Sequence, residues 1–232
     1  MLEAEKDQPD VDGRSTRWDA HKAQRRLEVL DAAVAAIEQD GPGVGVKQIA
    51  DRVGVPRPVV YRHFKDRADL DEQIRQRIID SLMAELSPTL RPDGTPVQAI
   101  RRAVLAYLDW IEQHPRLHEF LGAAVRADAP TAGSRIVAGT KAAIASQAAQ
   151  LFAMALKTSG KETTLAPQIA SGIIGFVDAS VNRWLADKRR TLTTAQLADF
   201  LTCSIWAILD GNLKALGVDF DPDQPIRRLL VD

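Results

Sequence analysis

The sequence contains one cysteine, few aromatic residues and no long uncharged hydrophobic run. A single thiol, Cys203, cannot form an internal disulfide and cannot by itself make a cysteine-based zinc site, which fits a reducing compartment. We expect this thiol to be buried and inert. No run of about 20 apolar residues could span a bilayer, and the first residues lack the basic and then apolar order of a signal peptide. These absences predict a cytoplasmic protein without a membrane partner.

A surplus of charge of one sign is also lacking, because the net charge of the 232 residues is −1. The distribution is nevertheless uneven: residues 1–13 hold one base and five acids, whereas residues 14–67 hold eleven bases and seven acids. We expect residues 1–16 to form a flexible acidic tail, and the basic segment after it indicates nucleic-acid binding by the N-terminal part. A hydrophobic share of 45% excludes a disordered or fibrous chain.

Strand signals are nearly absent, and apolar residues recur at spacings of three and four, which is typical of helices. The sequence therefore predicts an all-α fold, with an N-terminal three-helix bundle over 17–66 and a larger helical body over 67–232. One helix, 66–86, begins at the N-cap Asp66 and belongs structurally to both parts. The predicted helices are 18–39, 46–53, 56–64, 66–86, 97–113, 115–127, 134–158, 163–187 and 193–216.

The N-terminal surplus of bases concentrates between residues 42 and 67, where six bases face two acids. The pattern predicts a helix-turn-helix, in which Ala50 permits close helix approach and Gly54 permits the turn. The second helix can then project side chains into a major groove about 12 Å wide. Arg57 could pair with a guanine edge, Pro58 and Val59 could touch thymine methyls, and three polar side chains could bind phosphates. The candidate DNA-binding residues are Lys47, Arg57, Pro58, Val59, Tyr61, His63 and Lys65.

Each of these residues also has a simpler interpretation. Arg57 and Lys65 could be solvated surface charges, and Tyr61 could be a packing residue. The constellation as a whole favours DNA binding over these separate explanations.

The same stretch resembles the TetR family of bacterial transcriptional regulators. The resemblance covers about residues 17–70 and rests on Ile49-Ala50-(x)3-Gly54-Val55 followed by Val60-Tyr61-Arg62-His63-Phe64-Lys65-Asp66-Arg67-(x)2-Leu70. The sequence departs from the family pattern in four places. Gly45 stands where Ser or Thr commonly caps the first helix, Pro56 and Pro58 open the second helix, and Arg67 replaces the usual Lys.

In proteins similar to this one, the C-terminal domain binds a small ligand and dimerises through its last two helices. The resemblance thus implies a homodimer that pairs helices 163–187 and 193–216. A small-residue patch and an apolar face on these helices agree with this interpretation, although ordinary intrachain core is the alternative. The patch is Ala170, Gly172, Gly175, Ala179 and Ser180, and the face is Leu197, Leu201, Ile205, Ile208 and Leu209.

A ligand pocket needs an apolar lining and a few polar groups. An apolar or amphipathic effector is favoured slightly, because no charged cluster accompanies the candidates. Taken individually, each candidate is more often a core residue than a pocket residue. They are Met83, Tyr107, Trp110, Phe120, Leu121, Met154, Phe176, Asp178 and Asn182.

An enzyme is the competing class, and the sequence offers it little support. His114 and His118 are four residues apart and could hold a metal ion, but Pro115 places His114 before a helix and no third ligand is suggested. There is no glycine-rich phosphate loop and no nucleophile motif. We predict no catalysis and no cofactor.

The function implied is a ligand-responsive transcriptional regulator, a repressor by the family's usual sign. It would bind a palindromic double-stranded operator as a homodimer and be released by a small-molecule effector. A small-molecule-binding helical module, or an activator, is the alternative.

Overall fold

The computed structural model describes residues 13–125, 132–189 and 191–226, and within these ranges every regular element is a helix. The predicted all-α fold is confirmed. Residues 1–12 of the expected tail and the predicted end of helix 115–127 lie outside the described residues. The α-helices are α1 (Gly13–Asp40), α2 (Val46–Val53), α3 (Arg57–Val60), α4 (Arg67–Leu86), α5 (Pro96–Gln113), α6 (Pro115–Val125), α7 (Ala132–Thr158), α8 (Ala166–Ala186) and α9 (Thr194–Ala215), with a short 3-10 helix η1 (Ser87–Leu90) after α4.

Most helices have the predicted bounds to within a few residues, and the differences lie at their ends. α1 already begins at Gly13, inside the range expected for the tail. η1 occupies the start of the segment predicted as a loop. α8 begins at Ala166 rather than at residue 163, with Pro167 in its first turn, where a missing N–H removes no helical bond.

The N-terminal helices pack around a shared apolar core. Ala33 and Ile37 of α1, Ile49 of α2, and Leu70 and Ile74 of α4 are all almost completely buried. The expected N-cap of α4 is confirmed, because the Asp66 side chain accepts a hydrogen bond from the Asp69 N–H at 2.8 Å.

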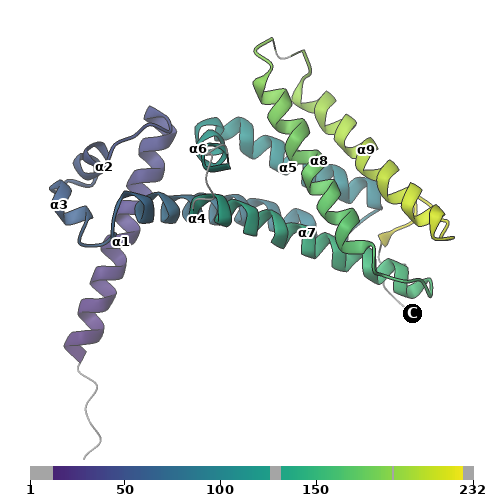
Figure 1. Ribbon diagram of the computed structural model, residues 1–232, viewed down its shortest axis with the longest axis horizontal. Helices are drawn as coiled ribbons and strands as arrows, with labels where there is room; N and C mark the ends of the chain where they lie inside the picture. Colours follow the sequence, from purple (N-terminus) through teal and green to yellow (C-terminus); the bar gives the residue numbers. More distant parts are fainter. Residues whose placement is uncertain (1–12, 126–131, 190, 227–232) are drawn as a thin grey trace, which may run out of the picture.

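α4 crosses the molecule from the N-terminal helices to the body (Figure 1). Its buried residues extend from Leu70 to Leu86. The hydrophobic core is continuous along this helix, because Phe64, Ile78, Leu108 and Leu201 belong to one buried cluster. The N-terminal helices and the body therefore share a core.

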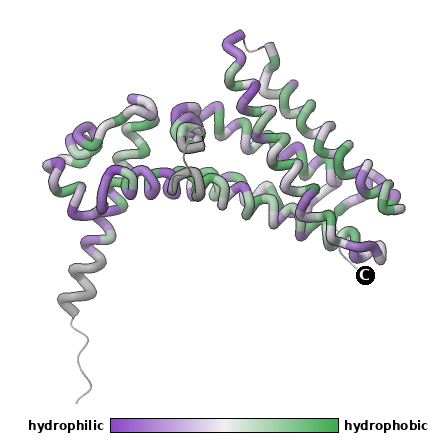
Figure 2. Tube along the Cα trace, viewed as in Figure 1, coloured by the Kyte–Doolittle hydropathy of each residue, from purple (hydrophilic) through white to green (hydrophobic). Residues whose placement is uncertain are grey.

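In the body, α5 packs against α9 and α7 packs against α8. α8 and α9 lie side by side (Figure 1), and hydrophobic residues run along much of both helices (Figure 2). After α9 the chain returns to the loop before α5, where the Ile226 N–H donates to the Gly94 carbonyl at 2.9 Å. Within the described ranges, no helix is long and apolar enough to cross a membrane.

The apolar face of α9 that was predicted to pair in a dimer lies partly inside the chain. Leu197, Leu201 and Ile205 are buried within the chain, so these three residues form intrachain core. Cys203 is exposed, and the expectation of a buried thiol is wrong. Because Cys203 follows Leu201 by two residues, it lies on nearly the opposite side of the helix and faces away from that core. On α8, Ala170 is buried, whereas Gly172, Gly175 and Ala179 are exposed.

Candidate functional site

The turn between α2 and α3 has the geometry that the sequence predicts. Gly54 adopts a left-handed conformation with φ of 74°, which side chains with a Cβ rarely adopt. The Val55 N–H then donates to the Ala50 carbonyl at 3.0 Å, and this bond closes the end of α2. Ala50 and Val60 are buried, so the two helices meet through small and branched side chains. The first helix thus braces the second.

The second helix of this unit is shorter than predicted. α3 ends at Val60, and beyond it the Arg62 and His63 N–H groups donate to the Val59 and Val60 carbonyls, three residues back. Bonds of this type tighten a helix into a 3-10 turn. The segment up to Phe64 continues as tight turns and ends with the Phe64 ring buried.

The bases of this unit fall into two groups. Arg52 is held by the Gln39 side chain at 2.7 Å and lies 3.8 Å from the Asp40 carboxylate. Arg67 bonds the Asp71 carboxylate and the Val44 carbonyl, each at 2.9 Å. These two arginines join α2 and α4 to the segments beside them. The bases without a carboxylate partner among the described residues are Lys47, Arg57, Arg62 and Lys65.

The structure brings two of the predicted DNA-binding residues, Arg57 and Tyr61, together. The Arg57 guanidinium lies 5.6 Å from the centre of the Tyr61 ring and 3.4 Å from its hydroxyl, so these two exposed side chains form one group. Of the other candidates, Lys47, Pro58 and Lys65 are exposed, whereas Val59 and His63 are half-buried.

His63 lies in a cationic environment that the motif alone did not indicate. Burial lowers the pKa of its imidazole, and the nearby charges of Lys22, Arg26, Arg25 and Arg62 lower this pKa further. Its Nδ1 atom is buried without a hydrogen-bond partner among the described residues. A neutral imidazole results, which can donate only one N–H.

Three of those bases come from α1, which sequence reasoning left out of the site. The Arg26 guanidinium lies 5.3 Å from the centre of the Phe64 ring and donates to the Gln73 side chain at 2.8 Å. It therefore joins α1 to α4 beside the turns that follow α3. The sequence signal for the three α1 bases was their spacing at positions 22, 25 and 26, which places them close together on a predicted helix.

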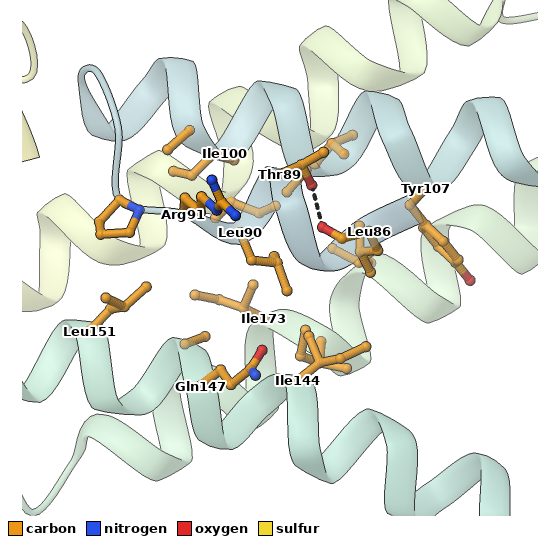
Figure 3. Close-up of a pocket in the computed structure, with 18 of the residues that line it drawn as sticks. Leu86, Thr89, Leu90, Arg91, Ile100, Tyr107, Ile144, Gln147, Leu151 and Ile173 are labelled. Atoms are coloured by element: carbon orange, nitrogen blue, oxygen red, sulfur yellow. Dashed lines mark hydrogen bonds between the residues drawn. The ribbon is translucent and has the colours of Figure 1, made fainter. Parts of the chain in front are cut away.

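A cavity of about 310 Å³ lies in the body, where α4, α5, α7 and α8 meet. Leu82 and Leu86 of α4 line it on one side, and Ile173 of α8 lines it on another. Figure 3 shows Ile144, Gln147 and Leu151 of α7 facing Leu90 and Ile100 across it. One helix therefore reaches both the helix-turn-helix and the cavity.

Two predicted ligand residues, Tyr107 and Asp178, line this cavity. Burial and the charge of Asp178 raise the pKa of the Tyr107 hydroxyl, so this group is a neutral phenol at physiological pH. The other seven are not part of its lining. Trp110, Phe120 and Leu121 are buried in the core, Met83 and Phe176 pack against it, and Met154 and Asn182 are exposed. The cavity wall consists mainly of aliphatic residues that resemble ordinary core in the sequence.

The two histidines of the competing interpretation have separate partners. His114 ends α5 and lies 3.2 Å from the Glu38 carboxylate of α1. His118 lies on α6 with its Nε2 atom 3.4 Å from the Tyr107 hydroxyl. Across the described parts of the chain, no three His, Cys, Asp or Glu side chains form a group that could hold a metal ion.

Known proteins resemble this chain in sequence. A model of "Bacterial regulatory proteins, tetR family" matches residues 29–74. An uncharacterized HTH-type transcriptional regulator from Mycobacterium tuberculosis is 28% identical over 208 residues, which cover 89% of this chain and 86% of that protein. The HTH-type transcriptional activator FasR from Mycolicibacterium smegmatis is 29% identical over 167 residues, which cover 72% of this chain and 74% of FasR.

The fold is also found among solved structures. A tetR-family transcriptional regulator from Streptomyces coelicolor has a TM-score of 0.67 at 21% identity, with 90% of this chain and 89% of that chain covered. The family match over 29–74 spans α2, α3 and the turn between them, whose geometry is described above. Residues 29–74 thus match the tetR family of bacterial regulatory proteins, and most of the chain resembles HTH-type transcriptional regulators in sequence and a tetR-family regulator in fold.

Proposed function

We propose that the protein is a homodimeric repressor that binds a palindromic operator and is released when a small molecule occupies the cavity of the body. The observation that carries this proposal is the path of α4. Its first turns pack under the helix-turn-helix at Leu70 and Ile74, and its last turn lines the cavity at Leu82 and Leu86.

The surface around α3 supports contact with DNA. Lys47, Arg57, Arg62 and Lys65 have no carboxylate partner within the described ranges, so their charges are available to phosphates. Arg57 has the planar fork that pairs with a guanine edge, and Tyr61 lies beside it. Two copies of the unit in a dimer would contact two half-sites.

α8 and α9 support dimerisation. Both helices expose uncharged stripes: Gly172, Gly175 and Ala179 on α8, and Phe200 and Ala207 on α9. Phe200 is 49% exposed, which is unusual for a large aromatic side chain unless another surface covers it. Pairing these stripes across a two-fold axis gives a four-helix arrangement whose small residues permit close approach.

The response to ligand follows from a population shift. A ligand that binds one arrangement of α4 more tightly than another increases the population of that arrangement. If the favoured arrangement separates the two helix-turn-helix units wrongly for successive major grooves, the operator is released. α6 offers a second connection to the N-terminal helices, because Arg116 donates to the Glu38 carbonyl of α1 at 3.1 Å.

The test selects duplexes from a random pool by retention on the protein and then measures their affinity by fluorescence anisotropy at several salt concentrations. We expect salt-dependent, sequence-specific binding. Lys65→Ala weakens all sequences alike and lowers the salt slope by about one. Lys157→Ala, an exposed lysine at the end of α7, is the matched control and leaves the slope unchanged. A chain that retains no DNA at low salt is instead a small-molecule-binding module.

Light scattering at micromolar concentration tests the dimer. The wild-type chain is expected to be a dimer, and Phe200→Asp is expected to shift it toward a monomer, because a carboxylate would be buried in the interface. Leu27→Asp, on a similarly exposed leucine of α1, is the control and leaves the dimer intact. A monomeric wild-type chain contradicts this part of the proposal.

An activator is the second candidate, since FasR, at 29% identity, is named a transcriptional activator. A reporter placed behind the selected operator distinguishes the two. Expression that falls when the protein is present supports the repressor, and expression that rises supports the activator.

A further inference from the structure

The cavity in the body is lined almost entirely by aliphatic side chains. Leucine, isoleucine, valine and alanine residues from α4, α5, α7, α8 and α9 make up most of its wall, and Ile226 of the C-terminal segment contributes to it. Tyr107 is the single aromatic residue among the described residues that line it. A flat aromatic ligand would find few ring faces to stack on, whereas a flexible alkyl chain fits such a wall.

Most polar groups in the wall already have partners. The Thr89 hydroxyl donates to the Leu86 carbonyl at 2.7 Å (Figure 3). The Lys141 ammonium lies 2.7 Å from the Asp178 carboxylate, so these two charges compensate each other. The Tyr107 hydroxyl lies 3.4 Å from the His118 ring. These groups therefore do not require a hydrogen bond or a compensating charge from a ligand.

Arg91 and Gln147 are different. Neither the Arg91 guanidinium nor the Gln147 side-chain amide has a hydrogen-bond or ion-pair partner among the residues that the structure describes. Arg91 follows η1 and Gln147 lies on α7, so they approach the cavity from different walls (Figure 3). Both side chains are exposed, which places an uncompensated positive charge and an amide donor at the solvent side of an aliphatic cavity.

We infer that the effector is an amphiphile with one aliphatic chain and an anionic head group, with the chain among the aliphatic side chains and the head group at Arg91. This inference rests on the proposed ligand response. A carboxylate or phosphate oxygen accepts hydrogen bonds from a guanidinium in a charge-assisted pair, which is stronger than a neutral one. An alkylammonium head group would instead be repelled by Arg91, and Asp178 is already paired with Lys141.

The size of the cavity agrees with a ligand of this kind. A volume of about 310 Å³ is near the lower end of ligand pockets, which hold roughly 300–1,000 Å³. The affinity is expected to rise with chain length while added methylenes are buried, at about 0.8 kcal/mol for each buried methylene, or ~4-fold in affinity. The rise ends when the chain fills the cavity.

The experiment measures binding to the full chain by calorimetry, with every amphiphile kept below its micelle concentration. The probes are a carboxylate series from hexanoate to hexadecanoate, together with dodecyl phosphate, dodecanol and dodecylamine. Dodecanoate or dodecyl phosphate is expected to bind more tightly than dodecanol and dodecylamine, and the stronger of these two anions identifies the head group. Tighter binding of dodecanol or dodecylamine, or a carboxylate series without a chain-length dependence, overturns the inference.

Arg91→Gln separates the head group from the chain. It is expected to weaken dodecanoate by about tenfold or more and to leave dodecanol nearly unchanged. Arg189→Gln, an exposed arginine between α8 and α9, is the matched control and changes neither. Equal losses for the acid and the alcohol would place the head group elsewhere and contradict the assignment to Arg91.

Ile144→Trp fills the cavity and is expected to abolish binding of the long-chain acids, while circular dichroism checks that the variant is folded. The carboxylate series on the wild-type chain decides the question if this variant does not fold. Operator binding in the same samples separates the two proposals. If no amphiphile binds but DNA does, the ligand class is wrong and the DNA function stands; if an amphiphile binds without releasing the operator, the ligand class stands and the proposed response fails.

Discussion

The helix-turn-helix and the body place their unpaired polar groups differently. In the helix-turn-helix, four bases lack a carboxylate partner among the described residues, lie on the outside and fall within twenty residues of sequence: Lys47, Arg57, Arg62 and Lys65. In the body, the cavity wall is assembled from five α-helices, η1 with the loop after it, and the C-terminal segment, and its unpaired groups come from segments more than fifty residues apart. In the proposed function, the first surface contacts a large charged partner and the second encloses a small one.

The two regions are nevertheless not independent. One buried cluster includes Phe64 beside α3 and Leu201 of α9, and α4 belongs to it along most of its length. A change in packing at the cavity can therefore be transmitted to the helix-turn-helix through packed side chains.

Phe64→Ala is expected to have the largest effect. This ring is 1% exposed, and its removal lowers the free energy of unfolding by about 3–5 kcal/mol through lost burial and a cavity. Because the core is continuous, unfolding followed by circular dichroism and by tryptophan fluorescence should show one transition in urea. Leu192→Ala, at an exposed leucine, is the control and costs within about 0.5 kcal/mol. Two separate transitions would show that the regions unfold independently.

Arg57→Ala tests the outward-facing part of the comparison. Loss of a bidentate contact to a base is expected to cost about 1–3 kcal/mol of operator affinity and to relax the base preference at one position of each half-site. Arg52→Ala is the matched control in the same unit, because Arg52 is held by Gln39 and Asp40. Competition with duplexes that carry single-base changes measures the preference. An unchanged preference in Arg57→Ala assigns base reading to another residue.

A pair of cap variants compares the two regions directly. Asp66 caps α4 through the Asp69 N–H, and Thr193 caps α9 through the Gln196 N–H at 3.2 Å. Asp66→Ala and Thr193→Ala are each expected to cost about 1 kcal/mol. If the regions unfold together, both variants lower the midpoint of the same urea transition. A shift confined to one spectroscopic probe would indicate a local opening instead.

The smallest expected effect is a pH dependence at His63. Its pKa in the folded chain is lowered by burial and by the bases around it, so the unfolded chain takes up a proton first as the pH falls. The stability that neutral His63 supports is complete above about pH 6.5 and declines as the pH falls below it. His63→Gln is expected to flatten the change in unfolding free energy between about pH 7.5 and 5.5. An unchanged slope would show that the imidazole titrates as it does in the unfolded chain.

The helix-turn-helix was largely predictable because its requirements are local. Gly54 was identified as a turn residue and has a φ of 74°, and Asp66 was identified as a cap and accepts the expected bond. The exact length of α3 was not predictable, because hydrogen bonds from Arg62 and His63 to carbonyls three or four residues back look the same in sequence. The α1 bases were missed because they lie outside the motif.

The cavity was less predictable for a physical reason. Trp110 and Phe120 carry the features expected of a pocket but fill core space, whereas Leu82 and Ile173 look like core and face the cavity. The packing of helices that are distant in sequence determines which apolar side chains border the cavity. Hydrophobic periodicity along one helix does not report this packing. Tyr107 and Asp178, which were among the candidates, line the cavity together with Arg91, which was not.

The continuity of α4 has a practical consequence for building hybrid regulators. A chimera joined at residue 66 would carry Phe64 away from Leu70 and Ile74, with which it shares a buried core, and would remove the Gln73 partner of Arg26. A junction beyond Leu86 keeps these contacts but transfers part of the cavity wall with them. Exchange of DNA specificity between such proteins should therefore be made by replacing exposed residues around Arg57 and Tyr61, rather than by exchanging whole segments.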